Sequence, residues 1–191
     1  MVIIKNRGIT QNWITGHKSL WASNANNLLL LNTTDSTINN SAIWNGSTPT
    51  SSVFSIGTDT GVSGNGNSLV AYCFSEVSGY SKFGIYTGNG SPDGPFVYIG
   101  FRPRYLMIKR TDSNNAGTAH WFEYDSARNT YNLTTNWLSA NLSNSESSTS
   151  SIDLLSNGFK WRDTGSSVNA SGGTYIFMAF AENPFKYSLA R

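Results

Sequence analysis

Tryptophan is the residue type in this sequence that is best suited to forming a binding site. The six tryptophans lie in polar, turn-rich stretches rather than in the continuous apolar segments. An indole ring can stack on the C–H face of a sugar while short amide and hydroxyl side chains bind the sugar hydroxyls. Trp44 and Trp137, each next to an asparagine, are therefore predicted to be exposed ligand-binding residues. The alternative is core packing, which the matched positions of Trp13 and Trp121 favour for that second pair.

Residues for covalent or acid–base catalysis are scarce. The chain has two histidines, eleven carboxylates and one cysteine, and it has no zinc-protease, serine-hydrolase or phosphate-loop motif. Glu76 and Glu182 each close an apolar strand at equivalent positions, and they could form a glycosidase-like pair. The favoured interpretation is that each carboxylate accepts backbone hydrogen bonds or pairs with Lys82 or Lys186 at a strand end. We therefore predict no enzyme activity, no catalytic residues and no cofactor.

Two loops carry oxygen-rich side chains. Asp59 is followed by Asn65 and Asn67, and Asp163 is followed by Asn169. Calcium sites concentrate several carboxylates, whereas each of these loops has one. We expect Asx turns and no metal site, with calcium binding as the open alternative.

Charge and hydropathy exclude two classes of partner. The net charge is +2, charged residues make up 13% of the chain, and the longest basic run is Lys109–Arg110. Nucleic-acid binding needs a clustered positive surface, so none is expected. The apolar run 175–181 is far too short to span a bilayer, so membrane insertion is not expected. Cys73, inside another apolar run, is predicted to be a small buried side chain.

An internal repeat organises the chain. Residues 62–76 match residues 168–182 at a constant offset of 106, with identical residues at Val62/Val168, Gly66/Gly172, Phe74/Phe180 and Glu76/Glu182. Earlier segments match at an offset of 104, and Trp13 matches Trp121 after a four-residue insertion. We predict two tandem units of about a hundred residues, 1–104 and 105–191, with one fused sandwich as the alternative.

Both copies are predicted to be all-β. The runs 69–77 and 174–181 are continuously apolar and bounded by Gly and Asn, as is typical of central strands buried on both faces. Shorter strands are expected at 53–56, 83–86, 96–99, 105–109, 121–124 and 159–161, with Gly- and Asn-rich turns between them. This spacing favours a β-sandwich or jelly-roll-like fold. The segment 80–104 has no counterpart before the first copy, so either it belongs to the first unit or a neighbouring chain supplies the missing element.

Several segments together resemble a domain common in structural proteins of marine bacteriophages and prophages, where it often lies beside concanavalin-like or laminin-G-like modules. The similarity lies in residues 42–45, 49–57, 70–84, 86–90, 100–110 and 154–160. The resemblance implies a location in the virion and adhesion to a host surface, and it brings no catalytic residues.

We therefore expect a virion structural protein, such as a tail-fibre or adhesion component, that binds host-surface glycans non-covalently. Its partners would be other virion proteins and further copies of itself, with a trimer favoured by virion symmetry. The alternative is a capsid decoration protein. A polysaccharide-degrading enzyme is a third and less favoured hypothesis.

Overall fold

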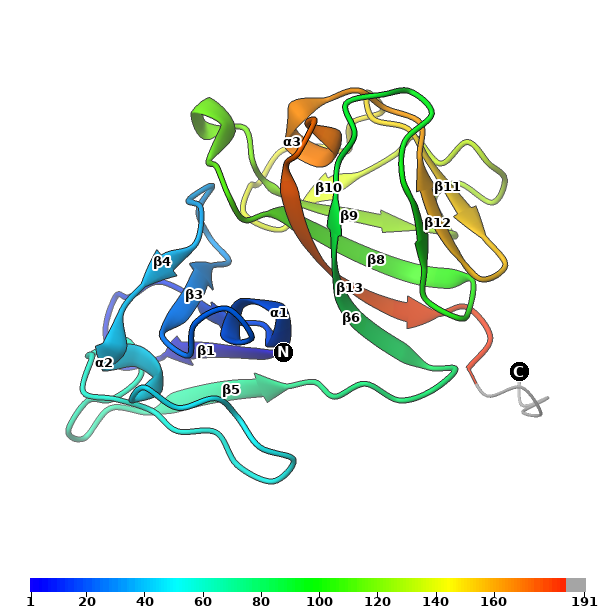
Figure 1. Ribbon diagram of the computed structural model, residues 1–191. Helices are drawn as coiled ribbons and strands as arrows, with labels where there is room; N and C mark the ends of the chain where they lie inside the picture. The colour runs from blue at the N-terminus through cyan, green and yellow to red at the C-terminus, as the bar shows by residue number, and fades with distance from the viewer. Residues whose placement is uncertain (185–191) are drawn as a thin grey trace.

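Antiparallel β-sheets make up most of the structure, as the abundance of β-branched and aromatic residues predicts. The computed structural model describes residues 1–184 (Figure 1). The all-β fold class is confirmed. The helices are single turns: α1 (Lys18–Trp21), α2 (Ser41–Trp44), α3 (Ser166–Asn169) and the 3-10 turn η1 (Asn115–Gly117).

Three sheets contain all the named strands. The first sheet has the spatial order β4 (Ile38–Asn39), β3 (Asn27–Leu30), β2 (Ile14–Gly16), β1 (Val2–Asn6) and β5 (Leu69–Cys73). The second has the order β10 (Leu138–Ser139), β9 (Trp121–Asp125), β8 (Pro103–Arg110), β13 (Thr174–Ala181) and β6 (Ser81–Thr87). The third has the order β11 (Ile152–Leu155), β12 (Gly158–Trp161) and β7 (Phe96–Tyr98). Of the expected strands, only 53–56 is absent.

The second sheet is the middle layer of the fold. Along β13, Tyr175, Phe177 and Ala179 belong to the hydrophobic cluster shared with the third sheet. Ile176 and Met178 belong instead to the cluster shared with the first sheet. Successive side chains of a strand point to opposite faces, so β13 is buried on both sides, as predicted. The second and third sheets pack as the two layers of a β-sandwich, and the first sheet packs on the outer face of the second.

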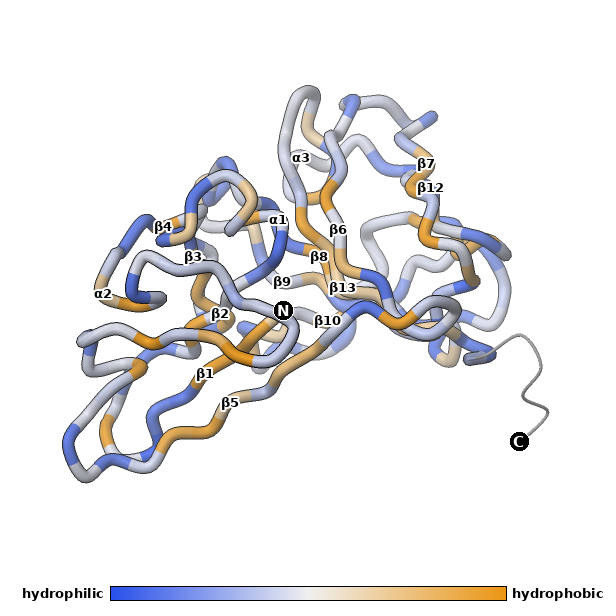
Figure 2. Tube along the Cα trace, turned by 60° about the horizontal axis from the view of Figure 1, so that its bottom comes forward, coloured by the Kyte–Doolittle hydropathy of each residue, from blue (hydrophilic) through white to orange (hydrophobic). Residues whose placement is uncertain are grey.

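Strand β5 is not the buried central strand that its sequence predicts. β5 has one strand partner within the described chain, β1, and lies at the edge of the first sheet. Figure 2 shows hydrophobic stretches along both β1 and β5, yet four of the five residues of β5 are exposed. Cys73 is exposed as well, so its expected burial is also wrong. The local pattern of β5 resembles that of β13, but no strand covers its outer edge among residues 1–184.

The two halves share a pairing register. Val2 of β1 lies opposite Cys73 of β5, and Leu106 of β8 lies opposite Ala179 of β13. These four residues are related by the offsets of 104 and 106 that relate the two segments in sequence. The register of β1 against β5 is therefore the same as the register of β8 against β13.

A side-chain hydrogen bond is also shared by the two halves. The backbone N–H of Trp13 donates to Asn32 Oδ1 at 2.8 Å, and that of Trp121 donates to Asn141 Oδ1 at 3.0 Å. Two copies of one unit would explain both correspondences, and the two-copy organisation stays a prediction.

The segment 80–104, placed in the first of the units 1–104 and 105–191, pairs with strands of the second half. β6 lies against β13 over seven residue pairs, from Thr174↔Thr87 to Phe180↔Ser81. β7 lies against β12 in the third sheet. The chain thus crosses from the edge of the first sheet to the edge of the second directly after β5.

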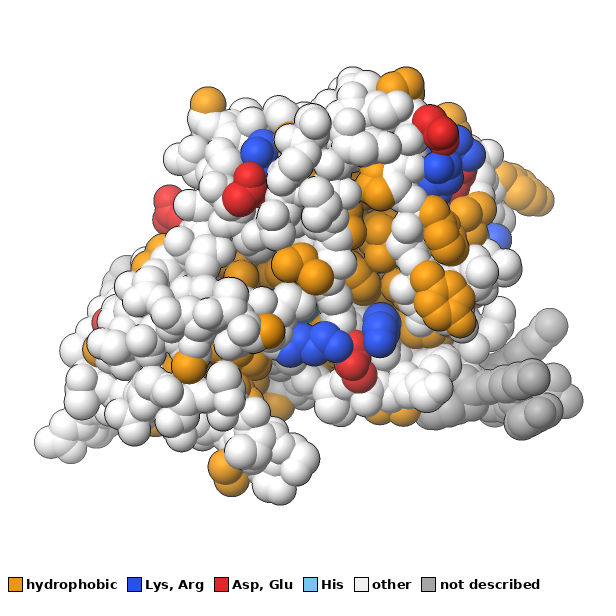
Figure 3. Space-filling view, in the orientation of Figure 1, with side chains coloured by type: hydrophobic (Ala, Val, Ile, Leu, Met, Phe, Trp, Pro, Cys, Tyr) orange, Lys and Arg blue, Asp and Glu red, His pale blue; other side chains and the backbone are white. Residues whose placement is uncertain are grey.

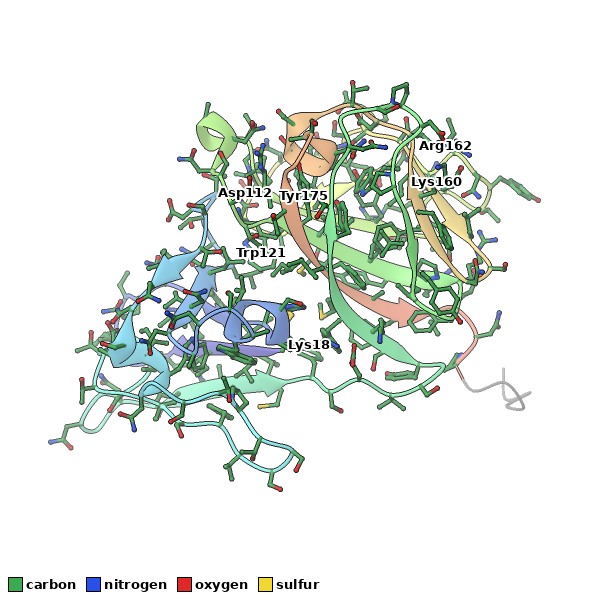
Figure 4. All side chains as sticks on the ribbon, viewed as in Figure 1. Lys18, Asp112, Trp121, Lys160, Arg162 and Tyr175 are labelled. Atoms are coloured by element: carbon green, nitrogen blue, oxygen red, sulfur yellow. The ribbon has the colours of Figure 1, made fainter. Side chains whose placement is uncertain are left out.

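Buried hydrogen bonds join the first sheet to the second. His17 Nε2 lies 3.1 Å from the carbonyl oxygen of Phe177 in β13. Trp121 Nε1 donates to the carbonyl of Leu30 at 2.9 Å, and Figure 4 shows Trp121 between the two halves. Because these donors are buried, the contact between the two layers is specific as well as hydrophobic.

The surface carries few charges, as the composition predicts. Figure 3 shows hydrophobic side chains gathered over β6 and β7, with isolated clusters of charge around them. The exposed apolar residues of these two edge strands are Ile85, Phe96 and Tyr98. Among residues 1–184, no helix has the length and hydrophobicity that crossing a membrane would require.

Candidate functional site

A cavity of about 300 Å³ lies beside Trp137, between the end of the second sheet and the loops that lead into α3. Its apolar wall comes from Phe122, Trp137 and Val168. Gly165, the hydroxyl groups of four residues and two ionisable side chains complete the lining; these side chains are Thr118, Thr149, Ser150, Ser167, His120 and Asp163. Apolar rings beside convergent polar groups are typical of a small-molecule site.

Trp137 is held in place by its backbone and by its ring. Its backbone pairs with Ser147, with N···O distances of 2.9 and 3.1 Å in the two directions. Its ring meets Phe122 of β9 edge-on, with ring centroids 4.8 Å apart. The side chain is half-buried, and its indole N–H has no hydrogen-bond partner among the described residues. The indole N–H is itself buried, so a ligand in the cavity would meet the aromatic ring of Trp137 rather than this donor.

The hydroxyl side of the cavity is an ordered network. Thr118 lies shortly before β9, and Ser167 lies in α3. The distance from Thr118 Oγ1 to Ser167 Oγ is 3.2 Å. Asn115 Nδ2 donates to both hydroxyls, at 2.7 Å and 2.9 Å. Thr118 Oγ1 also donates to the carbonyl of Asn115 at 2.8 Å and is fully engaged, so Ser167 Oγ is the one of the two that can still accept a hydrogen bond from a polar ligand.

Asp163 forms the Asx turn that the sequence predicts. Its Oδ1 accepts from the backbone N–H of Gly165, and its Oδ2 accepts from Ser150 Oγ, both at 2.6 Å. Asp59 makes the same turn in the first half, where its Oδ1 accepts from Gly61 N at 2.8 Å. In the described part of the chain, no three His, Cys, Asp or Glu residues come together as metal ligands would.

His120 adds no positive charge to the cavity near neutral pH. Burial, and secondarily the charge of Lys109, lower its pKa below the usual value, and a hydrogen bond with Asn141 opposes them. The distance from His120 Nδ1 to Asn141 Nδ2 is 3.0 Å, so Nδ1 accepts and Nε2 carries the proton. Asp163 is therefore the one charged group in the lining of this cavity at pH 7.

Trp44 does not lie at a surface site, and its prediction as an exposed ligand-binding residue is wrong. The side chain is 0% exposed, and its Nε1 donates to the carbonyl of Asn27 at 3.1 Å. It packs edge-on against Trp21, with ring centroids 5.4 Å apart. The Asn40 side chain caps α2 at the backbone N–H of Ala42, and this turn carries Trp44 into the core. The polar residues around Trp44 form helix caps rather than a binding surface.

Glu76 and Glu182 are each engaged in local ion pairs. Glu76 Oε1 lies 2.6 Å from Lys18 Nζ and 3.4 Å from Lys82 Nζ, so the expected pairing with Lys82 is confirmed. These lysines and a backbone hydrogen bond lower the pKa of Glu76, against the opposing effect of burial. Glu182 pairs with Arg102 at 3.0 Å, whereas its proposed partner Lys186 lies outside the described residues.

Sequence reasoning missed a second cavity, of about 480 Å³, at the end of β5. Cys73 and Phe74 line it together with Trp21, Phe54 and the Lys18–Glu76 ion pair. Figure 4 shows Lys18 facing the space between α1 and β6. The lining comes from five separate segments with no shared motif, so no local sequence signal could have indicated it.

A family model described as a domain of unknown function, DUF7483, matches residues 1–184. The chain belongs to this family. Searches of curated proteins and of solved structures find no match. The DUF7483 match covers both halves and all three sheets, so the cavity beside Trp137 lies within the family domain.

Proposed function

We propose that this DUF7483 domain is a non-catalytic carbohydrate-binding protein, and that the cavity beside Trp137 binds one neutral sugar residue. The observation that carries the proposal is the half-buried indole ring of Trp137, which lines the same cavity as two hydroxyl groups that the Asn115 amide holds in place. Pyranoses present C–H groups on one face and hydroxyls around the rim, which this pairing of ring and hydroxyls matches.

The charge of the cavity favours neutral sugars. Asp163 is negative, and His120 is neutral near pH 7 because its pKa is lowered by burial. A sugar carboxylate or sulfate would therefore meet a like charge with no cation to offset it. The volume of about 300 Å³ is at the lower end of the range of about 300–1,000 Å³ for ligand pockets, which suits one sugar rather than a long chain.

Non-covalent binding without turnover fits the same lining. Hydrolysis of a glycosidic bond needs two carboxyl groups on opposite sides of the bond, and the cavity supplies only Asp163. Both oxygens of Asp163 already accept hydrogen bonds from Gly165 and Ser150. We expect binding of glycans and no release of reducing ends.

The proposed biological setting is a bacteriophage particle, where the protein would attach the virion to glycans of the host surface. The support for this setting is the sequence resemblance to virion proteins of marine phages, together with a surface poor in charge. Exposed ion pairs weaken in salt, so hydroxyl and aromatic contacts suit sea water. One observation favours the alternative of a capsid decoration protein: the apolar edge strand β5, which could pair with the shell.

A glycan array of matched neutral and acidic oligosaccharides tests the proposal. Ser167→Tyr places a ring in the cavity without removing core side chains, and Trp137→Ala removes the stacking surface. Tyr98→Ala removes an aromatic ring that is 68% exposed and lies outside the cavity, so it serves as the matched control.

We expect the wild-type protein and Tyr98→Ala to bind the same neutral glycans, with both cavity variants losing at least tenfold in affinity, about 1.4 kcal/mol. Equal binding by Ser167→Tyr, with its melting temperature unchanged, would rule out this cavity. A preference for acidic glycans would contradict the charge argument.

A further inference from the structure

The outer edge of β5 presents backbone groups without partners. Met1 and Phe74 exchange both of their backbone hydrogen bonds, at 2.9 and 2.8 Å. In an antiparallel pair such residues alternate with residues whose N–H and C=O point away. Cys73, Ala71 and Leu69 therefore point their backbone groups away from β1, and within residues 1–184 these groups form no hydrogen bond.

The edge also lacks the features that usually prevent strand addition. Lys, Pro and β-bulges protect exposed edge strands in natural proteins. β5 has the sequence Leu-Val-Ala-Tyr-Cys, with no charge, no proline and an unbroken register of five pairs with β1. Its equivalent in the second sheet, β13, has the corresponding edge covered by β6. The first sheet thus has an open position where the second sheet has a strand.

We propose that β5 pairs with β5 of a second copy of this chain, antiparallel and around a two-fold axis at Ala71. In this register Ala71 faces Ala71 of the second copy, and Leu69 faces its Cys73. All three outward-facing residues then exchange their backbone hydrogen bonds with the other copy. The two first sheets become one continuous sheet.

Side chains on both faces fit this register. On one face, Leu69 of the second copy would lie against Cys73, at the mouth of the cavity of about 480 Å³. On the other face, Val70 of the second copy would lie against Tyr72, which is 48% exposed and stacks on Trp13 with centroids 6.5 Å apart. Each copy would bury apolar surface that is open in the monomer.

Charge is the reason to choose a second copy as the occupant. A strand that pairs with itself must not bring like charges opposite one another, and β5 has none to bring. An isologous pair also uses the same edge of both copies, so the assembly closes at two and leaves no open β5. This two-fold dimer would replace the trimer expected from virion symmetry, and it does not depend on sugar binding.

Charge reversal at the two-fold axis tests the pairing. Ala71→Lys and Ala71→Glu each bring like charges together, and we expect the dimer dissociation constant to rise about tenfold or more in either variant. An equimolar mixture of the two should recover dimers, which native mass spectrometry would identify as heterodimers. Ile85→Lys, on the exposed edge strand β6, is the matched control and should leave the wild-type dimer intact.

A disulfide test fixes the register. Leu69→Cys places a thiol opposite Cys73 of the second copy, at the Cα separation of about 5.5 Å that a disulfide accepts. Mild oxidation should give a covalent dimer, and Leu69→Cys combined with Cys73→Ser should give none. A wild-type protein that is monomeric or trimeric by light scattering, or an Ala71→Lys variant that stays dimeric, would overturn the proposal.

Discussion

Protonation of His17 should destabilise the protein well above the pH at which its carboxylates titrate. His17 is 0% exposed and caps α1, where its Nδ1 accepts from the backbone N–H of Ser19 at 3.1 Å. Its Nε2 must then carry the hydrogen that it donates to the Phe177 carbonyl. A second proton on Nδ1 would break the cap and charge a group that is buried between two sheets.

The size of the effect follows from the pKa. Burial is the main cause that lowers the pKa of His17 from 6.5 to about 4, with smaller contributions from the N-terminal ammonium of Met1 and from Lys18, whereas the Phe177 carbonyl and Glu76 oppose it. Because the folded pKa is the lower one, the unfolded chain binds the proton first as the pH falls. The stabilising contribution of neutral His17 is complete above pH 6.5 and is lost as the pH falls to 4. The loss is about 2 kcal/mol by pH 5 and about 3 kcal/mol by pH 4.

Urea unfolding followed by tryptophan fluorescence at pH 7, 6, 5 and 4 would measure this loss. The control is His17→Asn, which keeps a capping oxygen but does not titrate. It should be less stable than wild type at pH 7, because the bond to Phe177 is gone, and it should lose less stability on acidification. Parallel curves for the two proteins between pH 6.5 and 4.5 would refute a buried, neutral His17.

Three further predictions concern buried side chains. Lys109 is fully buried, and burial lowers its pKa from 10.5 to about 8. Because the unfolded chain releases this proton only at higher pH, the free energy of unfolding of wild type should rise by about 2 kcal/mol between pH 8 and 10, and that of Lys109→Met should not. Urea unfolding at the two pH values measures the difference. Trp121→Phe leaves the Leu30 carbonyl without its donor and should lower the free energy of unfolding by about 1–3 kcal/mol in the same assay. Trp44→Ala should cost about 3–5 kcal/mol of stability and leave glycan affinity unchanged, because the ring is wholly buried; unchanged stability would contradict its place in the core.

The sequence predicts the elements of the second half better than those of the first. The apolar run of β13 is buried on both faces as expected, because strands and sheets lie on both sides of it. The run of β5 has the same local character, yet its exposure depends on whether a strand covers its outer edge. In the second sheet β6 covers the corresponding edge of β13, whereas no strand within residues 1–184 covers the outer edge of β5. Edge and centre thus differ through pairing between distant segments, which a local pattern does not encode.

The two tryptophans chosen from sequence show the same limit. Trp44 and Trp137 each neighbour asparagine, but Asn40 and Asn45 begin and end a one-turn helix that places Trp44 in the core. Trp137 does line a cavity, although the cavity itself is assembled from segments near 120, 137, 150 and 165. Residue type indicated the aromatic ring, and only the fold shows which hydroxyls and which carboxylate surround it.

The indole N–H signals of the six tryptophans offer the most direct test of sugar binding at this cavity. Proton–nitrogen correlation spectra of labelled protein would be recorded while a neutral glycan selected on the array is added, with Trp137→Phe used to assign the Trp137 signal. The account predicts a saturable shift of the Trp137 indole, with the signals of buried Trp44 and Trp121 unmoved. Binding of the glycan with the Trp137 signal unmoved would contradict it.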